Sequence, residues 1–410
     1  MRLRTRPLLE KHTPATTGSA RSWRYHSVTL DLHAWTVWGG TAIAAAAFSY
    51  LTIASIAVRL RLKAVRSTLP AGAPPVTVLK PLCGDEHELY ECLRSFCDQI
   101  YPHFQIVFGV SDGADPAVDV VARLQREFPD IDLKLVVDRR QHGSSRKVSN
   151  LINMMAAARH EYLVMSDSDV RVRPDYLARV VAPLLDSEVG IVTCAYRGNP
   201  RPGIWSLLGA LFINDWFMPS VRVAAMSGSR SFAFGATIGI RRAVLTGIGG
   251  FAAIANQLAD DYRLGELTRR VGLATVLSDV IVETCVDERS FADLARHELR
   301  WLRTIRAVRP LGYTLSFITF GVPVALLGVL LAAGSWPSLI LLALTALARV
   351  VLHWAVRAPG EALKHLLALP LRDGLSVVLW AWGFVTRRVH WRDDRYQVTR
   401  DGSAQPVVRI

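Results

Sequence analysis

Long uncharged runs of hydrophobic residues stand near both ends of this 410-residue chain, and shorter hydrophobic runs alternate with polar residues between them. Residues 34–58 form the first long run, which is enough to cross the roughly 30 Å hydrocarbon core of a bilayer. Residues 311–348 form the second run, and Gly334-Ser335-Trp336-Pro337 divides it. The second run is too long for one buried core helix, so it predicts two spans joined by a tight hairpin.

A third apolar stretch, residues 366–385, is interrupted by Arg372 and Asp373. Its uncharged part, residues 374–386, is short for a span, which favours an interfacial or re-entrant helix. The first run lies too far from the start for a signal peptide, and it is too long and lacks a small-residue cleavage signature before Arg59. We therefore interpret it as a retained anchor.

Between the long runs, hydrophobic segments alternate in the manner of strands and helices. The pattern predicts strands at residues 76–82, 105–111, 133–137 and 162–166, and helices at residues 86–97, 116–128, 147–159 and 291–308. Strands that alternate with helices of about 10–15 residues are typical of an α/β fold with a doubly wound, mostly parallel sheet. In such a sheet, ligands bind beyond the carboxyl ends of the strands.

Acidic residues follow two of the predicted strands. Asp112 comes directly after the second strand, and Asp167 and Asp169 follow the fourth. Because the carboxyl ends of parallel strands meet at one edge of a sheet, these carboxylates are expected to face one crevice. Two carboxylates one residue apart suit a divalent cation that carries a nucleotide diphosphate. A lone Asp-x-Asp triplet fits a solvated turn equally well, so the other motifs decide between the two interpretations.

The chain carries a net charge of +13, which raises the question of a nucleic-acid partner. No nucleic-acid-binding motif is present in the sequence, so we expect no nucleic-acid partner. Basic residues crowd instead beside the apolar runs, which suits an anionic membrane surface and a cytoplasmic flank. They are Arg59, Arg61, Lys63, Arg66, Arg387, Arg388, Arg392 and Arg395. Residues 1–33 are also basic, which argues for the opposite orientation and leaves the topology open.

The five cysteines are odd in number and show no Cys-x-x-Cys spacing. A disulfide framework or a zinc site needs such pairs, so the sequence predicts reduced thiols that face the cytosol.

Four motifs, taken in order, are similar to those of a known family. Val110-Ser111-Asp112-Gly113-Ala114-Asp115-Pro116 is similar to its first aspartate motif, Asp167-Ser168-Asp169 to its second, and Leu258-Ala259-Asp260-Asp261-Tyr262 to its third. His297-Glu298-Leu299-Arg300-Trp301 stands where the family has a motif that starts with Gln or Arg and ends in Arg-Trp. Over roughly residues 70–400, the chain resembles the GT-A glycosyltransferases of the ceramide glucosyltransferase type, and most of all the bacterial branch associated with hopanoid biosynthesis.

The resemblance implies a GT-A domain at residues 70–309, held by the anchor at 34–58 and followed by a transmembrane hairpin at 310–356. An interfacial or re-entrant helix and a basic tail would occupy residues 357–410, and residues 1–33 would form a basic segment ahead of the anchor. The implied location is the bacterial inner membrane, crossed several times, with the catalytic domain on the cytoplasmic side.

The resemblance also implies a role for each site residue. Asp167 and Asp169 would bind Mg²⁺ or Mn²⁺. Asp261 would be the general base, and Asp260 beside it would raise its pKa by like-charge repulsion. Contacts to the nucleotide, the diphosphate and the acceptor would come from Lys80 in the opening strand, Asp112, Lys147, His297, Arg300 and Trp301. His297 replaces the usual Gln or Arg, which leaves its contact open.

The activity implied is transfer, with inversion, of glucose or N-acetylglucosamine from a UDP-sugar to a hydroxyl of a membrane lipid. A hopanoid polyol such as bacteriohopanetetrol is the first choice of acceptor, and ceramide is the second. A processive polysaccharide synthase shares the aspartate motifs but needs enough spans for a polymer channel. A transporter or lipid-binding protein without catalysis is the alternative from another class.

Two further patterns bear on the lipid. Arginines recur every three or four residues along the predicted helix at 291–308, a stripe typical of a helix that lies on anionic headgroups. An aromatic and apolar stretch fits either core packing or an acceptor-lipid groove, and it contains Phe212, Trp216, Phe217 and Met218.

Overall fold

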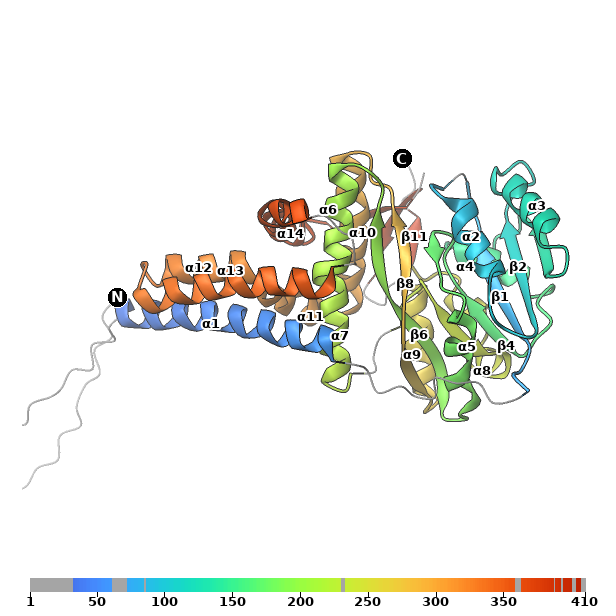
Figure 1. The fold of residues 1–410 in the computed structure, drawn as a ribbon, viewed down its shortest axis with the longest axis horizontal. Coiled ribbons are helices and arrows are strands. Elements are labelled where there is room, and N and C mark those ends of the chain that lie inside the picture. The colour runs from blue at the N-terminus through green and yellow to red at the C-terminus, as the bar shows by residue number, and fades with distance from the viewer. Residues whose placement is uncertain are drawn as a thin grey trace, which may run out of the picture.

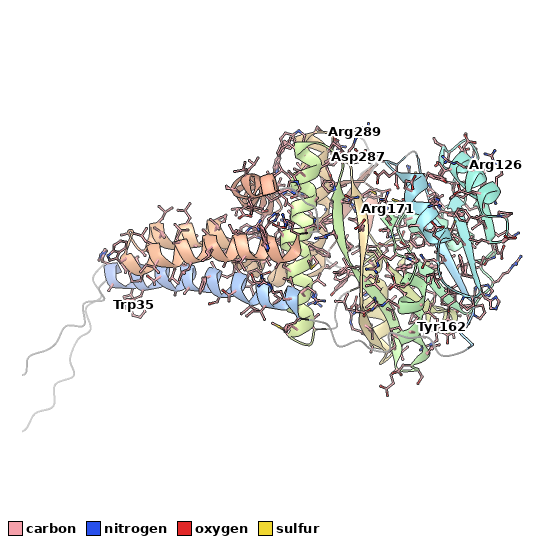
Figure 2. All side chains as sticks on the ribbon, viewed as in Figure 1. Trp35, Arg126, Tyr162, Arg171, Asp287 and Arg289 are labelled. Atoms are coloured by element: carbon pink, nitrogen blue, oxygen red, sulfur yellow. The ribbon has the colours of Figure 1, made fainter. Side chains whose placement is uncertain are left out.

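The computed structural model describes residues 32–60, 72–84, 86–229, 233–357, 363–386, 388–391, 394–399 and 403–406. A rod of long helices projects from one side of an α/β domain, and shorter helices cross the base of the rod (Figure 1). Trp35 lies toward the far end of the rod, and Arg126 lies at the opposite end of the molecule (Figure 2). Nearly all of the predicted basic segment 1–33 lies outside the described residues, as do Arg61, Lys63, Arg66, Arg387 and Arg392.

The first half of the α/β domain alternates strands and helices. Its elements are β1 Val76–Pro81, α2 Leu89–Cys97, β2 Phe104–Val110, α3 Ala117–Glu127, β3 Asp132–Val137, α4 Arg146–Met154 and β4 Tyr162–Met165. β1 pairs in parallel with both β2 and β4, and β2 pairs in parallel with β3. All four predicted strands are present, so the predicted alternation is confirmed.

The second half of the sheet is mixed. It contains β5 Val170–Arg171, β6 Val189–Pro200, β7 Ile238–Arg241 and β8 Ala274–Val286, with α5 Tyr176–Val181, η1 Ala182–Leu185, α8 Arg242–Gly247, η3 Phe251–Ile254 and α9 Asp260–Arg270. β7 runs antiparallel to β4 and β6, β6 and β8 are parallel, and β5 is antiparallel to β8. The strand order is β3-β2-β1-β4-β7-β6-β8-β5. The parallel arrangement expected from the sequence thus describes the first four strands, whereas the rest of the sheet combines three antiparallel pairs with the parallel pair of β6 and β8.

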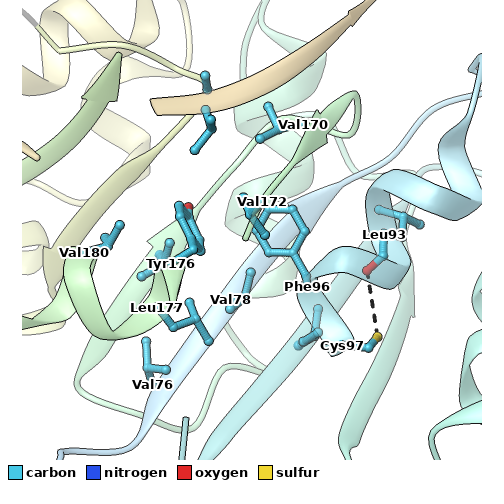
Figure 3. Packing of buried hydrophobic residues seen from close by; sticks show 14 of the residues in the cluster. Val76, Val78, Leu93, Phe96, Cys97, Val170, Val172, Tyr176, Leu177 and Val180 are labelled. Carbon is cyan, nitrogen blue, oxygen red and sulfur yellow. Dashed lines mark hydrogen bonds between the residues drawn. The ribbon is translucent and has the colours of Figure 1, made fainter. Parts of the chain in front are cut away.

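Hydrophobic cores lie on both faces of this sheet. Alternate residues of a strand point to opposite faces, so Val76 and Val78 join one core and Leu79 joins the other. In the first core, the ring of Phe96 packs edge-on against Tyr176 at a centroid distance of 5.5 Å (Figure 3). Burial of each such large apolar side chain stabilises the fold by about 1.5–3 kcal/mol. The packed strands hold the acids at their carboxyl ends in fixed positions.

The rod consists of α1 Leu32–Arg59, α12 Gly321–Leu331 and α13 Trp336–Val356, which pack side by side (Figure 1). Glycines allow two of these helices to meet closely, since a Cβ atom on Gly40 would lie 2.4 Å from the carbonyl oxygen of Gly328. α1 and α13 are each long and apolar enough to cross a membrane. These two helices support membrane association of the chain.

The first arm of the predicted hairpin is broken. It begins with α11 Pro310–Leu315 and the turn η4 Ser316–Thr319, and the chain then bends by 78° before α12. Pro323 in the first turn of α12 has no N–H to continue a helix from the preceding turn. α12 itself has only 11 residues. By length and composition, the described residues therefore contain two candidate spans, or three if the bent pair counts as one.

The helices that cross the base of the rod are α6 Ile204–Phe212, the π-helical turn η2 Ile213–Phe217, α7 Met218–Met226, α10 Phe291–Val308 and α14 Leu369–Trp382, which follows η5 Leu363–Ala368. In Figure 1, α6, α7 and α10 run at a steep angle to the rod, and α14 is seen end-on. α10 has the bounds that the sequence predicts.

Arg372 and Asp373, which interrupt the third apolar stretch, form ion pairs inside the fold. The Arg372 side chain is 2% exposed and donates to both carboxylate oxygens of Glu298 in α10, at 2.5 and 3.0 Å. Asp373 accepts a hydrogen bond from Arg349 of α13 at 3.0 Å. The two charges therefore attach α14 to α10 and α13.

The C-terminal residues form a small antiparallel sheet of β9 Arg388–Trp391, β10 Asp394–Val398 and β11 Ala404–Pro406, where the sequence suggested a basic tail. Arg303 of α10 is 8% exposed and donates to the carbonyl oxygen of Arg388 at 2.7 Å. The expectation that the arginine stripe lies on lipid headgroups is therefore wrong for Arg303, because the helix face that carries it is covered by this sheet.

Candidate active site

A cavity of about 810 Å³ lies beyond the carboxyl ends of the parallel strands. Pro81 at the end of β1, Asp138 after β3 and Asp167 after β4 all line it. Asp260 and Asp261, at the start of α9, line it from the second half of the domain. Residues far apart in the sequence thus meet at the edge of the sheet where the topology predicts a ligand.

Lys147 joins two of the aspartate motifs. Its Nζ lies 2.5 Å from Oδ1 of Asp167 and 3.5 Å from Oδ2 of Asp260. The residue stands in the first turn of α4, which Ser145 caps by accepting a hydrogen bond from the N–H of Val148 at 3.3 Å. Burial alone would lower the pKa of Lys147, but the charges of Asp167 and Asp260 raise that pKa well above its ordinary value. The lysine is therefore a permanent cation between the carboxylates.

Asp261 is held by two backbone N–H groups. Gly235 donates to Oδ2 at 2.8 Å, and Tyr262 donates to Oδ1 at 2.7 Å. Burial, followed by the neighbouring charge of Asp260, raises the pKa of Asp261 to about 6, although Lys147 and the two N–H groups oppose the shift. A carboxylate with a pKa near neutrality that lines a cavity is suited to accept a proton.

Asp169 contacts the strand β8. Its Oδ2 accepts a hydrogen bond from the hydroxyl of Thr284 in β8 at 2.5 Å. Burial and the charge of Asp167 raise the pKa of Asp169 above its ordinary value. Both aspartates line the cavity.

Lys80 does not line the cavity. Its side chain is buried, its Nζ donates to the backbone carbonyl of Asp167, and the ammonium lies 3.9 Å from the centre of the Phe96 ring. Burial lowers the pKa of Lys80 to about 8. In this structure the lysine holds the strand end that carries Asp167 from within the core, and its expected nucleotide contact stays a prediction.

The donor set fits a divalent cation bound largely by its substrate. Among the described residues, no three of His, Cys, Asp and Glu gather closely enough to hold a metal ion by themselves. Mg²⁺ is commonly bound by one or two carboxylates together with substrate phosphates and water. Asp167 and Asp169 supply such hard oxygen ligands, and Lys147 is placed to balance their charge.

Asp112 lies at the rim of the cavity. Its Oδ1 accepts hydrogen bonds from Nη2 of Arg139 at 2.8 Å and from the N–H of Ala114 at 3.1 Å. Arg139 and Ser111 line the cavity, whereas Asp112 itself is outside the described lining. The two hydrogen bonds to Ala114 and Arg139 lower the pKa of Asp112.

His297, Arg300 and Trp301 lie on one face of α10, three and four residues apart, and all line the cavity. Nδ1 of His297 lies 2.7 Å from Oε1 of Glu288, a carboxylate that is 7% exposed. The ring of His297 meets Trp301 edge-on at 4.8 Å. Burial lowers the pKa of Arg300, and the charge of Asp167 is the largest opposing effect.

Aromatic side chains also line the cavity, and we call the set Tyr196, Phe217, Phe234 and Trp301 the aromatic wall. Ring centroids lie 4.7 Å apart for Tyr196 and Phe217, 5.2 Å for Phe217 and Phe234, and 6.2 Å for Tyr196 and Trp301. Of the stretch that the sequence left between two interpretations, Phe212 and Met218 are buried in cores, and Trp216 and Phe217 line the cavity.

Several lining residues were not predicted from the sequence. Glu86 and Asp138 follow β1 and β3, so the rule that singled out Asp112 and Asp167 applies to them as well. Burial, followed by the charge of Asp169, raises the pKa of Glu86 to about 7. Tyr196 and Phe234 carry no such signal, because only the folded chain brings them to the site.

Comparison with protein families agrees with this geometry. A family model described as Glycosyl transferase family 21 matches residues 40–404. The chain belongs to glycosyltransferase family 21. The resemblance drawn from the aspartate motifs is thereby confirmed at the level of the family.

Curated relatives of this family 21 member are ceramide glucosyltransferases. Ceramide glucosyltransferase 3 of Caenorhabditis elegans is 26% identical over 58% of this chain and 52% of its own length. Ceramide glucosyltransferase 1 of the same organism is 25% identical over 50% of this chain and 44% of its own length. The enzyme of Komagataella phaffii is 34% identical over 29% of this chain and 25% of its own length. The chain spans about half the length of the two nematode relatives that it matches.

Among solved structures, a mannosyltransferase from Pyrobaculum calidifontis in complex with GDP-Man and Mn²⁺ is similar, with a TM-score of 0.50 and 21% identity. The similarity covers 86% of this chain and 94% of that chain. It confirms the predicted α/β fold class of GT-A type.

Proposed function

We propose that this family 21 member is an inverting glycosyltransferase that moves a sugar from a UDP-sugar to a hydroxyl of a membrane lipid. One observation carries the proposal. A carboxylate with a pKa raised to about 6, Asp261, shares a cavity with the Asp167 and Asp169 pair and with an aromatic wall. The same cavity thus offers a base, a diphosphate site and an apolar surface.

Asp261 is the proposed general base. It would take the proton of the acceptor hydroxyl while that oxygen attacks the anomeric carbon on the face opposite the diphosphate. The new C–O bond forms as the bond from the anomeric carbon to the phosphate oxygen breaks, and the electron pair leaves with UDP. One displacement inverts the anomeric centre, as in inverting glycosidases with an alcohol in place of water.

The donor side is proposed from the charges. Asp167 and Asp169 would hold Mg²⁺ or Mn²⁺, and such an ion, when bound, neutralises charge on the departing diphosphate. Lys147 and Arg300 would pair with the phosphate oxygens. Asp112 and Arg139 at the rim would contact the uridine. The mannosyltransferase of similar fold was solved with GDP-Man and Mn²⁺, a sugar nucleotide and a metal of the kind proposed here.

The acceptor side is proposed from the aromatic wall. Trp216 lines the cavity, and its Nε1 donates to the hydroxyl of Thr319 in η4 at 2.7 Å. The residue therefore stands where the cavity meets the membrane helices, which suits the apolar body of a lipid. A hopanoid polyol is our first choice of acceptor, and N-acetylglucosamine or glucose is the sugar. Ceramide with UDP-glucose is the second candidate, because the curated relatives are ceramide glucosyltransferases.

The proposed location is the bacterial inner membrane, with the cavity on the cytoplasmic side against an anionic surface. The helices α1 and α13 support a location in a membrane. The basic residues beside the apolar runs support the cytoplasmic side. Five free cysteines are compatible with a reducing compartment.

The test uses the full chain in lipid nanodiscs with labelled UDP-glucose and UDP-N-acetylglucosamine. Bacteriohopanetetrol and ceramide are supplied separately, and products are identified by mass spectrometry. A lipid that gains one hexose or one N-acetylhexosamine, with inverted anomeric configuration, is expected. A polymeric product would favour a polysaccharide synthase instead. Binding of lipid without transfer, unchanged in Asp261→Asn, would favour a non-catalytic lipid-binding protein.

A further inference from the structure

Consecutive residues of the π-helical turn η2 contact different parts of the molecule. Asn214 holds the sheet, since its side chain accepts from the N–H of Gly198 at 2.8 Å and donates to the Gly198 carbonyl at 3.0 Å. Trp216 stacks between Phe212 at 4.7 Å and Phe320 at 5.8 Å. Phe217 belongs to the aromatic wall. The turn therefore connects the sheet, the broken span and the cavity within four residues.

Asp215 connects the same turn to the membrane-spanning helix α13. Its Oδ2 accepts a hydrogen bond from Nη1 of Arg349 at 2.8 Å and lies 2.8 Å from Nδ1 of His353. The side chains of Asp215 and His353 are each 2% exposed, and that of Arg349 is 8% exposed. A buried carboxylate with two partners on one helix fixes the distance and the angle between the turn and that helix.

Arg349 is shared between two acids on different elements. Its Nη1 faces Asp215, and its Nε donates to Asp373 of α14 at 3.0 Å. Asp215 is directly followed by Trp216 and Phe217, which line the cavity, whereas Asp373 lies on α14 and is outside the described lining. Both acids thus pair with one arginine, Asp215 through Nη1 and Asp373 through Nε and Nη2, but they differ in their distance along the chain from the cavity.

A buried ion pair is weak evidence for net stability, because desolvation offsets the attraction. Its stronger effect is to fix one arrangement of the elements that it joins. A π-helical turn within a longer helix is also a rare conformation and is frequent at functional sites. Both features here coincide at the residue that precedes the cavity-lining aromatic pair.

We propose that Asp215 is a positioning residue for the acceptor: its contacts with Arg349 and His353 hold η2 against α13, so that Trp216 and Phe217 form the lipid-binding side of the cavity. The inference rests on the proposed glycosyl transfer to a lipid. It assigns to the membrane helices a direct role in shaping the acceptor site, in addition to anchoring the chain.

The experiment compares Asp215→Asn with the matched control Asp373→Asn in the full chain. Each variant removes one carboxylate from Arg349. Asp215→Asn also removes the carboxylate beside His353, and Asp373→Asn removes the one that accepts from Nε and Nη2 of Arg349. For Asp215→Asn we expect the KM for the acceptor lipid to rise at least tenfold, with UDP affinity within twofold of the parent chain. For Asp373→Asn we expect both values within twofold. Equal effects of the two variants on the acceptor KM would overturn the proposal and leave a structural role only.

A second measurement separates this proposal from the proposed activity. Amide hydrogen exchange of residues 213–217 is followed by mass spectrometry in nanodiscs without substrate. Asp215→Asn is expected to increase exchange there at least fivefold over Asp373→Asn, and this holds if no lipid proves to be an acceptor. Unchanged exchange contradicts the proposal. If Asp215→Asn fails to fold, Asp215→Glu is compared with Asp373→Asn instead, because glutamate keeps the charge on a longer side chain. Exchange or an acceptor KM equal to that of Asp373→Asn again overturns the proposal.

Discussion

The backbone N–H of Gly235 donates a hydrogen bond of 2.8 Å to Oδ2 of Asp261. Gly235 also lies where three charged side chains converge. A Cβ atom on this residue would be 3.2 Å from Nζ of Lys147, 3.4 Å from Oδ2 of Asp167 and 3.5 Å from Oδ2 of Asp261. The absence of a side chain at residue 235 thus allows two of the aspartate motifs and the lysine to meet.

The first prediction concerns this glycine. Gly235→Ala adds a methyl group that displaces Lys147 by a few tenths of an ångström, and Gly235→Val adds more. We expect a loss of transfer rate of about tenfold for alanine and more for valine, since small errors of placement in a site are costly. Gly247→Ala, at a residue with nothing within 4 Å of the added Cβ, is the control and should retain the parent rate. Equal rates for Gly235→Ala and Gly247→Ala would contradict the crowding argument.

Asp261→Asn tests the proposed base. We expect the transfer rate to fall by about 10²–10⁴, the usual contribution of a general base, while UDP binding by calorimetry stays within twofold. The thermal stability at high pH should change in the opposite direction to the transfer rate. Because the folded state raises the pKa of Asp261, it favours the protonated carboxyl, and the stability given by that proton is lost as pH rises through about 6. The uncharged asparagine escapes this loss, so the melting temperature at pH 8 should be no lower than that of the parent chain.

The pH dependence of the rate follows from the same group. A base must be deprotonated to act, so kcat should fall about tenfold for each pH unit below about 6 and level off above it. Glu86, whose pKa burial raises to about 7, lines the same cavity and is the competing explanation. In Glu86→Gln the acidic limb should persist. If the acidic limb disappears in that variant, the limb reports the titration of Glu86 and not of Asp261.

Removal of divalent cations tests the role of Asp167 and Asp169. We expect EDTA to abolish transfer and Mg²⁺ or Mn²⁺ to restore it, since the two carboxylates and the diphosphate together form the proposed site. The variant Asp167→Asn should need a higher metal concentration for half-maximal rate. Full activity of the parent chain in EDTA would remove both residues from metal binding.

Some parts of this structure can be predicted from the sequence, and others cannot. The strands β1 to β4 and the helix α10 follow from local periodicity, and parallel strand ends alone place Asp167 and Asp138 at one edge of the sheet, where both line the cavity. The mixed half was not predictable in this way, because β5 and β7 have only two and four residues, and antiparallel pairing depends on distant partners. Lys80 shows a second limit. A lysine in an opening strand looks available for a phosphate, and only the packing of Phe96 and Asp167 around it shows that it is buried.

The pair Arg372 and Glu298 supplies the last prediction. In the sequence, Arg372 and Asp373 interrupt an apolar stretch and leave a part that is short for a span, which favours an interfacial or re-entrant helix. Their burial depends on partners elsewhere in the chain, Glu298 and Arg349, which no local pattern shows.

Arg372→Met should leave the Glu298 carboxylate buried without its partner, at a cost of about 3–5 kcal/mol. The double variant Arg372→Met/Glu298→Met removes both charges and should recover most of that loss, since desolvation offsets much of what the pair contributes. Arg289→Ala is the control, because Arg289 is 71% exposed in its 3.0 Å ion pair with Asp287 and such surface pairs contribute about 0–1 kcal/mol. Apparent melting temperatures in one detergent measure all three. If Arg372→Met melts together with Arg289→Ala, the buried pair does not hold α14 in place, and the attachment of this helix must come from its apolar face alone.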